Sequence, residues 1–132
     1  LFEAHSEDAY VDFFNERNIP FMLSKQGPKA AVADVNGDGQ DDIFIGGAKD
    51  QASQLYIQTA TGFVKEQIPD FNTYKFNDIT AAVFFDCDND GDLDLIAGGG
   101  GNFTNASSGV FQIFLYLNNG KGMFTLQRGA IP

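Results

Sequence analysis

The chain contains 132 residues, of which 43% are hydrophobic and 14% aromatic, and its formal net charge is −10. This length is typical of one domain, with enough apolar side chains for a packed core. The acidic balance argues against binding to nucleic acid or to an anionic membrane surface, and no apolar run approaches the roughly 18 residues of a membrane-spanning helix.

Residues 1–29 repeat nowhere else in the chain, and we interpret them as a lead-in segment. Within it, Tyr10–Phe14 is aromatic enough to form a strand, the last of a preceding unit. The alternative is that this stretch packs on the face of the unit that follows. A Gln-Gly-Pro sequence at residues 26–28 predicts a turn into that unit.

Residues 30–80 form the first of two similar units. Short apolar runs that are rich in β-branched and aromatic residues and bounded by glycine are typical of β-strands. An acidic loop, residues 34–42 (DVNGDGQDD), separates the first two runs. The pattern predicts four strands in this unit, at Ala30–Ala33, Asp42–Ile45, Gln54–Gln58 and Phe63–Gln67.

Residues 81–132 form the second unit and carry a second acidic loop, residues 86–94 (DCDNDGDLD). The loops align with an offset of 52 residues and the later strands with an offset of 60, so the second unit has a loop insertion at about residues 100–109. Two N-glycosylation sequons there, at Asn102 and Asn105, would be used in a secreted eukaryotic protein and are chance matches in a bacterial one. The predicted strands are Ala81–Phe85, Asp94–Ala97, Phe111–Leu117 and Met123–Gln127.

Both loops read D-x-[DN]-x-D-G-x-x-D, which places side-chain oxygens at loop positions 1, 3, 5 and 9 and a glycine at position 6. Alternate residues project oxygens toward one centre, the glycine permits a sharp turn, and the position-7 carbonyl can point inward. Several hard oxygen ligands suit Ca²⁺ rather than Zn²⁺ or Mg²⁺. An EF-hand is excluded, because it needs helical flanks and a bidentate Glu at position 12, where this chain has Ile45 and Ala97.

Four antiparallel strands per unit make up a β-propeller blade. The predicted fold is therefore all-β, with two four-stranded antiparallel β-propeller blades that carry calcium-binding hairpin loops. The two loops, their trailing Ile/Leu-x-x-Gly-Gly and the later Leu-Tyr-[Ile/Leu] resemble the FG-GAP (VCBS-type) repeats of integrin alpha subunits and of many bacterial surface and secreted proteins. The resemblance covers roughly residues 25–127. Two blades cannot close a ring that needs about four to eight, so we expect the chain to be a fragment of a larger propeller.

The resemblance also implies two Ca²⁺ ions per chain, one in each hairpin, and it implies their ligands. In the first loop these are Asp34, Asn36, Asp38, Asp42 and the Gln40 carbonyl. In the second they are Asp86, Asp88, Asp90, Asp94 and the Asp92 carbonyl. The second loop offers one carboxylate more than the first, so we expect it to bind Ca²⁺ more tightly.

By the same resemblance, the module is an extracellular scaffold for adhesion or for binding a protein or carbohydrate ligand, in a bacterial protein that is secreted, at the cell surface or periplasmic. Extracellular calcium modules bind at about 0.1–1 mM, which would leave such sites empty in the cytosol. The alternative is a non-catalytic propeller portion of a secreted carbohydrate-active enzyme. We predict no catalytic residue in the chain itself: its one histidine, His5, lies in the lead-in segment, and its one cysteine, Cys87, is a filler at loop position 2.

Apolar side chains on both faces of the predicted strands indicate that each sheet is covered on both sides. Leaving such a side chain in water costs roughly 1.5–3 kcal/mol. We therefore expect self-association into a closed symmetric oligomer, packing on further blades, or a cover formed by residues 1–29. The side chains concerned are Val32, Ile43, Ile45, Val83, Phe84, Phe85, Leu95 and Ile96.

Overall fold

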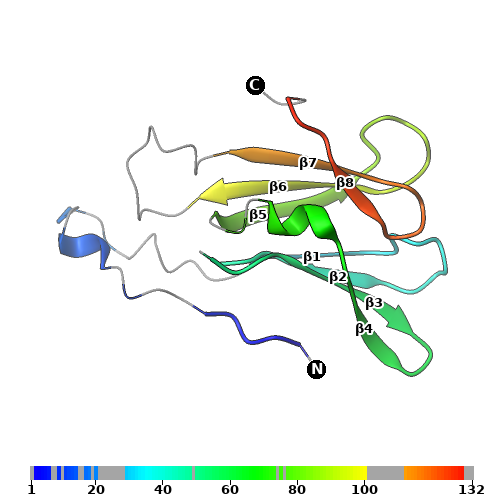
Figure 1. The fold of residues 1–132 in the computed structure, drawn as a ribbon, viewed down its shortest axis with the longest axis horizontal. Helices are drawn as coiled ribbons and strands as arrows, with labels where there is room; N and C mark the ends of the chain where they lie inside the picture. Colours follow the sequence, from blue (N-terminus) through cyan, green and yellow to red (C-terminus); the bar gives the residue numbers. More distant parts are fainter. Residues whose placement is uncertain are drawn as a thin grey trace.

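The computed structural model of the protein describes residues 2–6, 9, 11–14, 17–18, 20, 29–48, 50–73, 75, 77–100 and 112–129. Its strands form two four-stranded antiparallel sheets, each built from strands that are consecutive in the sequence (Figure 1). The first sheet contains β1 (Ala30–Ala33), β2 (Asp42–Ile45), β3 (Gln54–Thr59) and β4 (Gly62–Glu66). The second contains β5 (Asp78–Phe85), β6 (Asp94–Gly100), β7 (Ile113–Asn118) and β8 (Phe124–Leu126). The predicted all-β fold is confirmed, and the arrangement is consistent with two propeller blades.

The strands begin and end close to the predicted positions, and the largest differences are in β5 and β6. β5 begins earlier than predicted, at Asp78, and β6 continues further, to Gly100. These extra residues pair with one another, Asp78 with Gly100 and Ile79 with Gly99. The Ile79 N–H also donates to the Gly47 carbonyl at 2.9 Å, which ties the second sheet to the first. Glycines have no side chain to show a strand pattern, so the sequence did not reveal this extension.

The core lies between the two sheets and is built from alternate side chains of the strands. Phe44 of the first sheet and Leu95 of the second are fully buried. Phe71, in the 3-10 helix η3 (Pro69–Asn72) that joins the sheets, packs edge-on against Phe44 at 5.5 Å and against Tyr116 at 5.2 Å. The buried members of the core are Val35, Phe44, Leu55, Ile68, Phe71, Ile79, Leu95, Ala97, Phe114, Tyr116 and Phe124.

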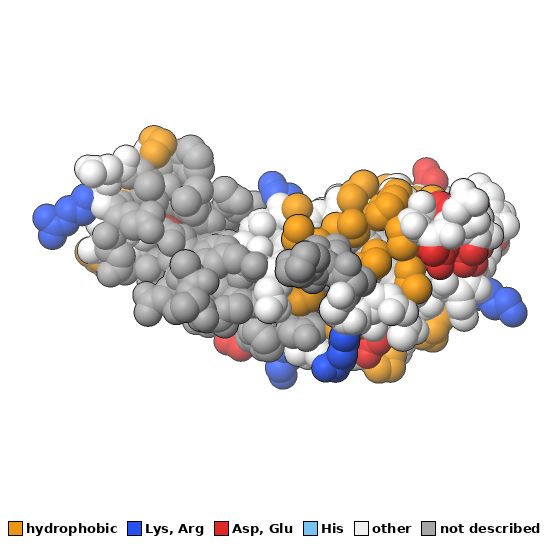
Figure 2. Space-filling model, turned by 90° about the horizontal axis from the view of Figure 1, so that it is seen from above, with side chains coloured by type: hydrophobic (Ala, Val, Ile, Leu, Met, Phe, Trp, Pro, Cys, Tyr) orange, Lys and Arg blue, Asp and Glu red, His pale blue; other side chains and the backbone are white. Residues whose placement is uncertain are grey.

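The apolar side chains that were predicted to need a cover differ in their exposure. Leu95 is fully buried between the sheets, and Phe84 packs against the core. On the faces that point away from the other sheet, the exposed fraction is 58% for Val32, 52% for Val83 and 38% for Phe85. For the second sheet, Figure 2 shows hydrophobic side chains gathered on the outward face. The half-buried members are Ile43, Ile45 and Ile96.

Residues 2–6 lie against the outward face of the first sheet. The Phe2 ring contacts the rings of Tyr56 and Phe63, with centroid distances of 4.5 Å and 5.6 Å. The Glu3 N–H donates to the Tyr56 hydroxyl at 3.0 Å. This part of the lead-in segment therefore covers the β3–β4 side of that face.

The strand predicted over Tyr10–Phe14 is wrong for Asp12–Phe14, which form the 3-10 helix η1. The Phe14 N–H donates to the Val11 carbonyl at 3.2 Å, so this backbone group is satisfied within a tight turn. A strand would need a neighbouring strand for the same purpose. Phe14 is 80% exposed, whereas Asp12 is fully buried.

The insertion predicted at about residues 100–109 lies outside the described residues, except for Gly100 at the end of β6. The sequons at Asn102 and Asn105 are likewise outside the described part of the chain. The same holds for Phe111, the first residue of the strand that is observed as β7.

Candidate metal centre

The two acidic loops occupy the same place in the two sheets. Residues 34–42 connect β1 to β2, and residues 86–94 connect β5 to β6. Both loops lie at the same end of the sheets, on the right in Figure 1. The Asn118 side chain, at the end of β7, donates to the Val35 carbonyl in the first loop at 2.7 Å. The fold therefore gathers both candidate sites at one edge of the molecule.

The aspartate at loop position 1 organises the backbone of each loop. Asp34 accepts hydrogen bonds from the backbone N–H groups of positions 4 and 6, both at 2.7 Å. Asp86 accepts from the same two positions, at 2.7 Å and 3.1 Å. Each loop therefore curls around its first carboxylate.

Positions 4 and 6 of both loops adopt the left-handed backbone conformation. At position 6, φ is 84° for Gly39 and 95° for Gly91, in agreement with the sharp turn expected of that glycine. At position 4, φ is 75° for Gly37 and 65° for Asn89. Asparagine is enriched in this region among residues other than glycine. Position 4 was not among the predicted site positions, although a Gly or Asn in both loops is a visible signal.

Positions 3 and 5 continue the turn with side-chain acceptors. In the first loop, Asn36 accepts from the position-5 N–H at 3.1 Å and Asp38 from the position-7 N–H at 2.8 Å. In the second loop, Asp88 and Asp90 accept from the same positions, at 3.2 Å and 2.9 Å. The side chains at positions 1, 3 and 5 thus all bend back over their own loop.

The aspartate at position 9 has a different structural role, because it is fully buried in both loops. One oxygen of Asp42 accepts from the position-2 N–H at 3.0 Å, and the other accepts from the Gln58 N–H in β3 at 2.8 Å. Asp94 makes the matching bonds, to position 2 at 3.0 Å and to the Asn118 N–H in β7 at 2.9 Å. Each position-9 carboxylate therefore ties the start of its loop to the third strand of its sheet.

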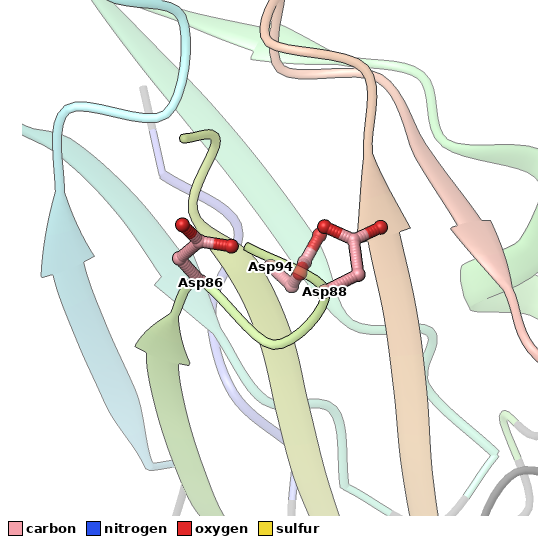
Figure 3. A group of neighbouring side chains, drawn as sticks. All are labelled: Asp86, Asp88 and Asp94. Atoms are coloured by element: carbon pink, nitrogen blue, oxygen red, sulfur yellow. The ribbon is translucent and has the colours of Figure 1, made fainter. Parts of the chain in front are cut away.

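Three carboxylates of the second loop come close enough to hold one ion (Figure 3). Asp86, Asp88 and Asp94 each offer an oxygen, and these oxygens lie within 4.8 Å of one another. Within the described residues, no other group of three Asp, Glu, His or Cys side chains is that close. Calcium binds oxygens at about 2.3–2.6 Å, so oxygens at this mutual separation can share one Ca²⁺. The donor set fits that ion, while the Asp90 carboxylate lies outside the group.

The first loop brings together fewer charges, because its position 3 is an amide. Asn36 donates from its side-chain nitrogen to the Asp38 carboxylate at 3.1 Å. The Gln40 side-chain amide lies 3.4 Å from the same oxygen. Asp34 and Asp42 keep the backbone contacts of their counterparts in the second loop. The first loop therefore has the same backbone scaffold but balances part of its own charge with amide dipoles.

The pKa values of the loop carboxyls reflect these contacts. Backbone N–H groups, that of Gly39 above all, lower the pKa of Asp34. Lost hydration raises the pKa of Asp88, and the nearby Asp90 charge adds to the rise. Burial raises the pKa of Asp42. Repulsion among neighbouring carboxylates is a cost that a bound divalent cation would remove.

Cys87 makes a contact that its predicted role as a filler did not include. Its thiol interacts with the Asp94 carboxylate, and this contact raises the pKa of Cys87 to about 11. Burial alone would raise the pKa of Asp94, but the Cys87 thiol and the backbone N–H groups outweigh burial, so the pKa of Asp94 is lowered. In the first loop the same position is occupied by Val35, which has no donor in its side chain.

Asn118 links the two loops and was not among the predicted site residues. Its side-chain amide donates to the carbonyls of Val35 and Leu93, at 2.7 Å and 3.1 Å. Its side-chain oxygen accepts from the Gly122 N–H at 3.1 Å. Gln58 occupies the same repeat position in the first sheet. An amide residue directly after the Leu-Tyr-[Ile/Leu] run in both units was the signal that could have found it.

Residues 34–97 match the family model described as FG-GAP-like repeat. The match begins at the first aspartate of the first loop and contains both acidic loops. This segment of the chain is therefore an FG-GAP-like repeat, and the resemblance drawn from the loops is confirmed for it. Searches among curated proteins and among solved structures gave no significant match. FG-GAP repeats are typical of extracellular proteins, and the described residues include no helix that is long and apolar enough to span a membrane.

Proposed function

We propose that this chain is a calcium-binding FG-GAP-type repeat module that acts as an extracellular scaffold. The observation that carries the proposal is the group formed by Asp86, Asp88 and Asp94, whose oxygens are close enough to share one ion. Oxygen-only ligands of this kind suit Ca²⁺. The ion would balance the crowded carboxylates and stiffen the hairpin between the first two strands of the sheet.

The same scheme extends to the first loop, where Asp34, Asn36, Asp38 and Asp42 occupy the equivalent positions. Backbone carbonyls at position 7, those of Gln40 and Asp92, would complete each set. The near-identical hydrogen bonds of the two loops support two Ca²⁺ ions per chain. The amide at position 3 supports weaker binding in the first loop, because a site with less ligand charge attracts the ion less strongly.

The wider role proposed for the module is adhesion or the binding of a protein or carbohydrate ligand, in a secreted, cell-surface or periplasmic bacterial protein. Support for this role comes from the FG-GAP-like repeat itself. We propose no catalytic role for the chain, whose one histidine, His5, lies in the lead-in segment. As the non-catalytic part of a secreted carbohydrate-active enzyme, the module would have the same calcium chemistry.

Calorimetric titration of chelator-treated protein with CaCl₂ tests the proposal, with two bound Ca²⁺ ions per chain as the expected result. Asp88→Asn should weaken one of the two sites. Asp92→Asn is the matched control, since it makes the same charge change at a side chain that lies beside Gly120 and outside the three-carboxylate group. Absence of calcium uptake, or a preference for Zn²⁺ in a competing titration, would contradict the proposal.

A further inference from the structure

The outward face of the second sheet is an apolar surface. The exposed fraction is 54% for Ile113, 52% for Val83 and 38% for Phe85. The side chains of this face come from β5, β6 and β7, and Figure 2 shows them beside the acidic side chains of the loop edge. Apolar area of this kind, rimmed by charge, is characteristic of an interaction surface.

The repeat register shows what this face is built to contact. The side chains of the first sheet that pack toward the second are Ala31, Ala33, Phe44, Leu55 and Ile57. Offsets of 52 and 60 residues carry these positions onto Val83, Phe85, Ile96, Leu115 and Leu117. The latter set lies on the outward face of the second sheet, since these residues alternate with the buried Leu95 and Tyr116. The outward face is thus the repeat equivalent of a face that already packs against a sheet.

The complementary half of the interface is also present, at the other end of the chain. The side chains of the second sheet that face the first include Phe84, Leu95, Ala97 and Tyr116. Their repeat equivalents are Val32, Ile43, Ile45 and Tyr56, on the outward face of the first sheet. The chain therefore carries both halves of its internal interface a second time, one half on each outward face.

An aromatic ring occupies the same place on both complementary halves. Phe71 packs edge-on against Tyr116 at 5.2 Å, and Phe2 packs edge-on against the equivalent Tyr56 at 4.5 Å. In the internal interface, Phe71 also reaches Phe44 on the facing sheet, at 5.5 Å. Phe2 has no facing sheet and remains 49% exposed. The outward face of the first sheet therefore has the same aromatic ring against its tyrosine as the second sheet has in the internal interface.

Side-chain sizes on the two outward faces are complementary as well. In the internal interface, the small alanines of β1 lie against β5, which presents Phe84. On the outward faces, β5 presents Val83 and Phe85, and β1 presents Ala30 and Val32. The large Phe85 of β5 would thus again be set against smaller side chains of β1, as close packing demands.

We infer that the outward face of the second sheet is a docking surface for the outward face of the first sheet in a second copy of this chain. The contact is head-to-tail and repeats the internal packing of the two sheets, with Phe2 of one chain against Ile96 of the other. A heterologous contact of this kind forms a ring when its rotation closes. The contact between chains would thus be equivalent, by the repeat, to the contact between the two sheets within one chain.

Light scattering of the full 132-residue chain in saturating calcium tests this inference, with Val83→Glu and Val32→Glu as the variants. Both positions are more than half exposed, so a glutamate there leaves the core intact. The unaltered chain should have the mass of an oligomer, and each variant alone should have the mass of one chain. An equimolar mixture of the two variants should form a heterodimer, because each variant keeps the face that the other has lost.

Val64→Glu is the matched control, since Val64 is an exposed strand valine (54%) on β4 and belongs to neither outward face. It should keep the mass of the unaltered chain, and circular dichroism should show all three variants to be folded. A monomer at high concentration of the unaltered chain would overturn the inference. A Val32→Glu variant that keeps the oligomer mass would also overturn it, since two second-sheet faces would then dock on each other. An equimolar mixture of the Val83→Glu and Val32→Glu variants that contains only monomers would overturn it as well.

Discussion

The two acidic loops share one backbone scaffold and differ in the charge that they place on it. In both, position 1 holds the N–H groups of positions 4 and 6, and position 9 ties the loop to the third strand. At position 3, the second loop has Asp88 and the first has Asn36. The three-carboxylate group forms in the second loop, whereas in the first the amide of Asn36 donates to Asp38.

The difference at position 3 shows that the D-x-[DN]-x-D-G-x-x-D pattern has two separate roles, one in the shape of the hairpin and one in the attraction for a cation. The shape of the hairpin comes from hydrogen bonds to backbone groups, and these bonds survive the change from Asp to Asn at position 3. The attraction for a cation comes from the number of carboxylates, and that number changes between the loops.

Removing the position-9 carboxylate of either loop should cause the largest loss of stability, even when no calcium is present. Asp42→Ala or Asp94→Ala leaves two backbone N–H groups without their acceptor, and a buried unsatisfied group costs about 1–3 kcal/mol. The expected loss in the free energy of unfolding is therefore roughly 2–6 kcal/mol, measured by chemical denaturation in EDTA. Asp88→Ala, an exposed position, is the control and should change little in EDTA. Equal losses at positions 3 and 9 would show that the scaffold is not separate from the ligands.

Calcium removal should cause the next largest effect. A ligand that binds only the folded state stabilises it by about 1.4 kcal/mol per site at tenfold saturation, so two sites contribute roughly 3 kcal/mol. EDTA should therefore lower the melting temperature of the unaltered chain by several degrees. In Asp88→Ala the shift should be about half as large, since one site is lost. A melting curve that EDTA leaves unchanged would show that the loops hold no structural calcium.

Exchanging the residues at position 3 should exchange the affinities of the loops. Asn36→Asp adds a carboxylate to the first loop, and Asp88→Asn removes one from the second. We expect each change to alter the calcium affinity of its loop about tenfold, equivalent to 1.4 kcal/mol, and calorimetry of the double variant should show the order of the sites reversed. If the second loop stays the tighter site, loop rigidity rather than ligand charge sets the order.

The smallest predicted effect concerns the neighbour of the position-9 carboxylate. Cys87→Val removes the thiol donor and should raise the pKa of Asp94, whereas Val35→Cys should lower the pKa of Asp42. A carboxyl whose pKa is lowered in the folded state stabilises the protein at pH values above 3.8, its ordinary pKa. This contribution is lost as the pH falls through the pKa of the folded state. The valine variant should therefore lose less stability on acidification. NMR titration of the carboxyl carbons in EDTA measures both shifts, and unchanged values would show that the thiol does not matter.

Much of the local structure followed from the sequence. Short β-branched runs predicted the first two strands of the first sheet at their observed bounds, Ala30–Ala33 and Asp42–Ile45. The alternation of oxygens in the two loops predicted hairpins between the first two strands of each unit. These features depend on interactions between residues that are close in the chain, and the sequence displays such interactions directly. The strand predicted over Tyr10–Phe14 was wrong at Asp12–Phe14, because aromatic composition alone does not supply a partner strand.

The tertiary structure decided which faces are covered and which carboxylates are buried. Strands such as Val83–Phe85 are apolar on both faces, so alternation could not show that Phe84 would pack inward and Val83 outward. The burial of Asp42 and Asp94 likewise depends on N–H donors in β3 and β7, which are distant in the chain. The sequence determined the repeat, the strands and the oxygen side chains of the two loops, because these depend on spacing within each unit. Packing of one unit on the other determined the core, the position-9 anchors and the two outward faces, because each requires contacts between residues that only the fold brings together.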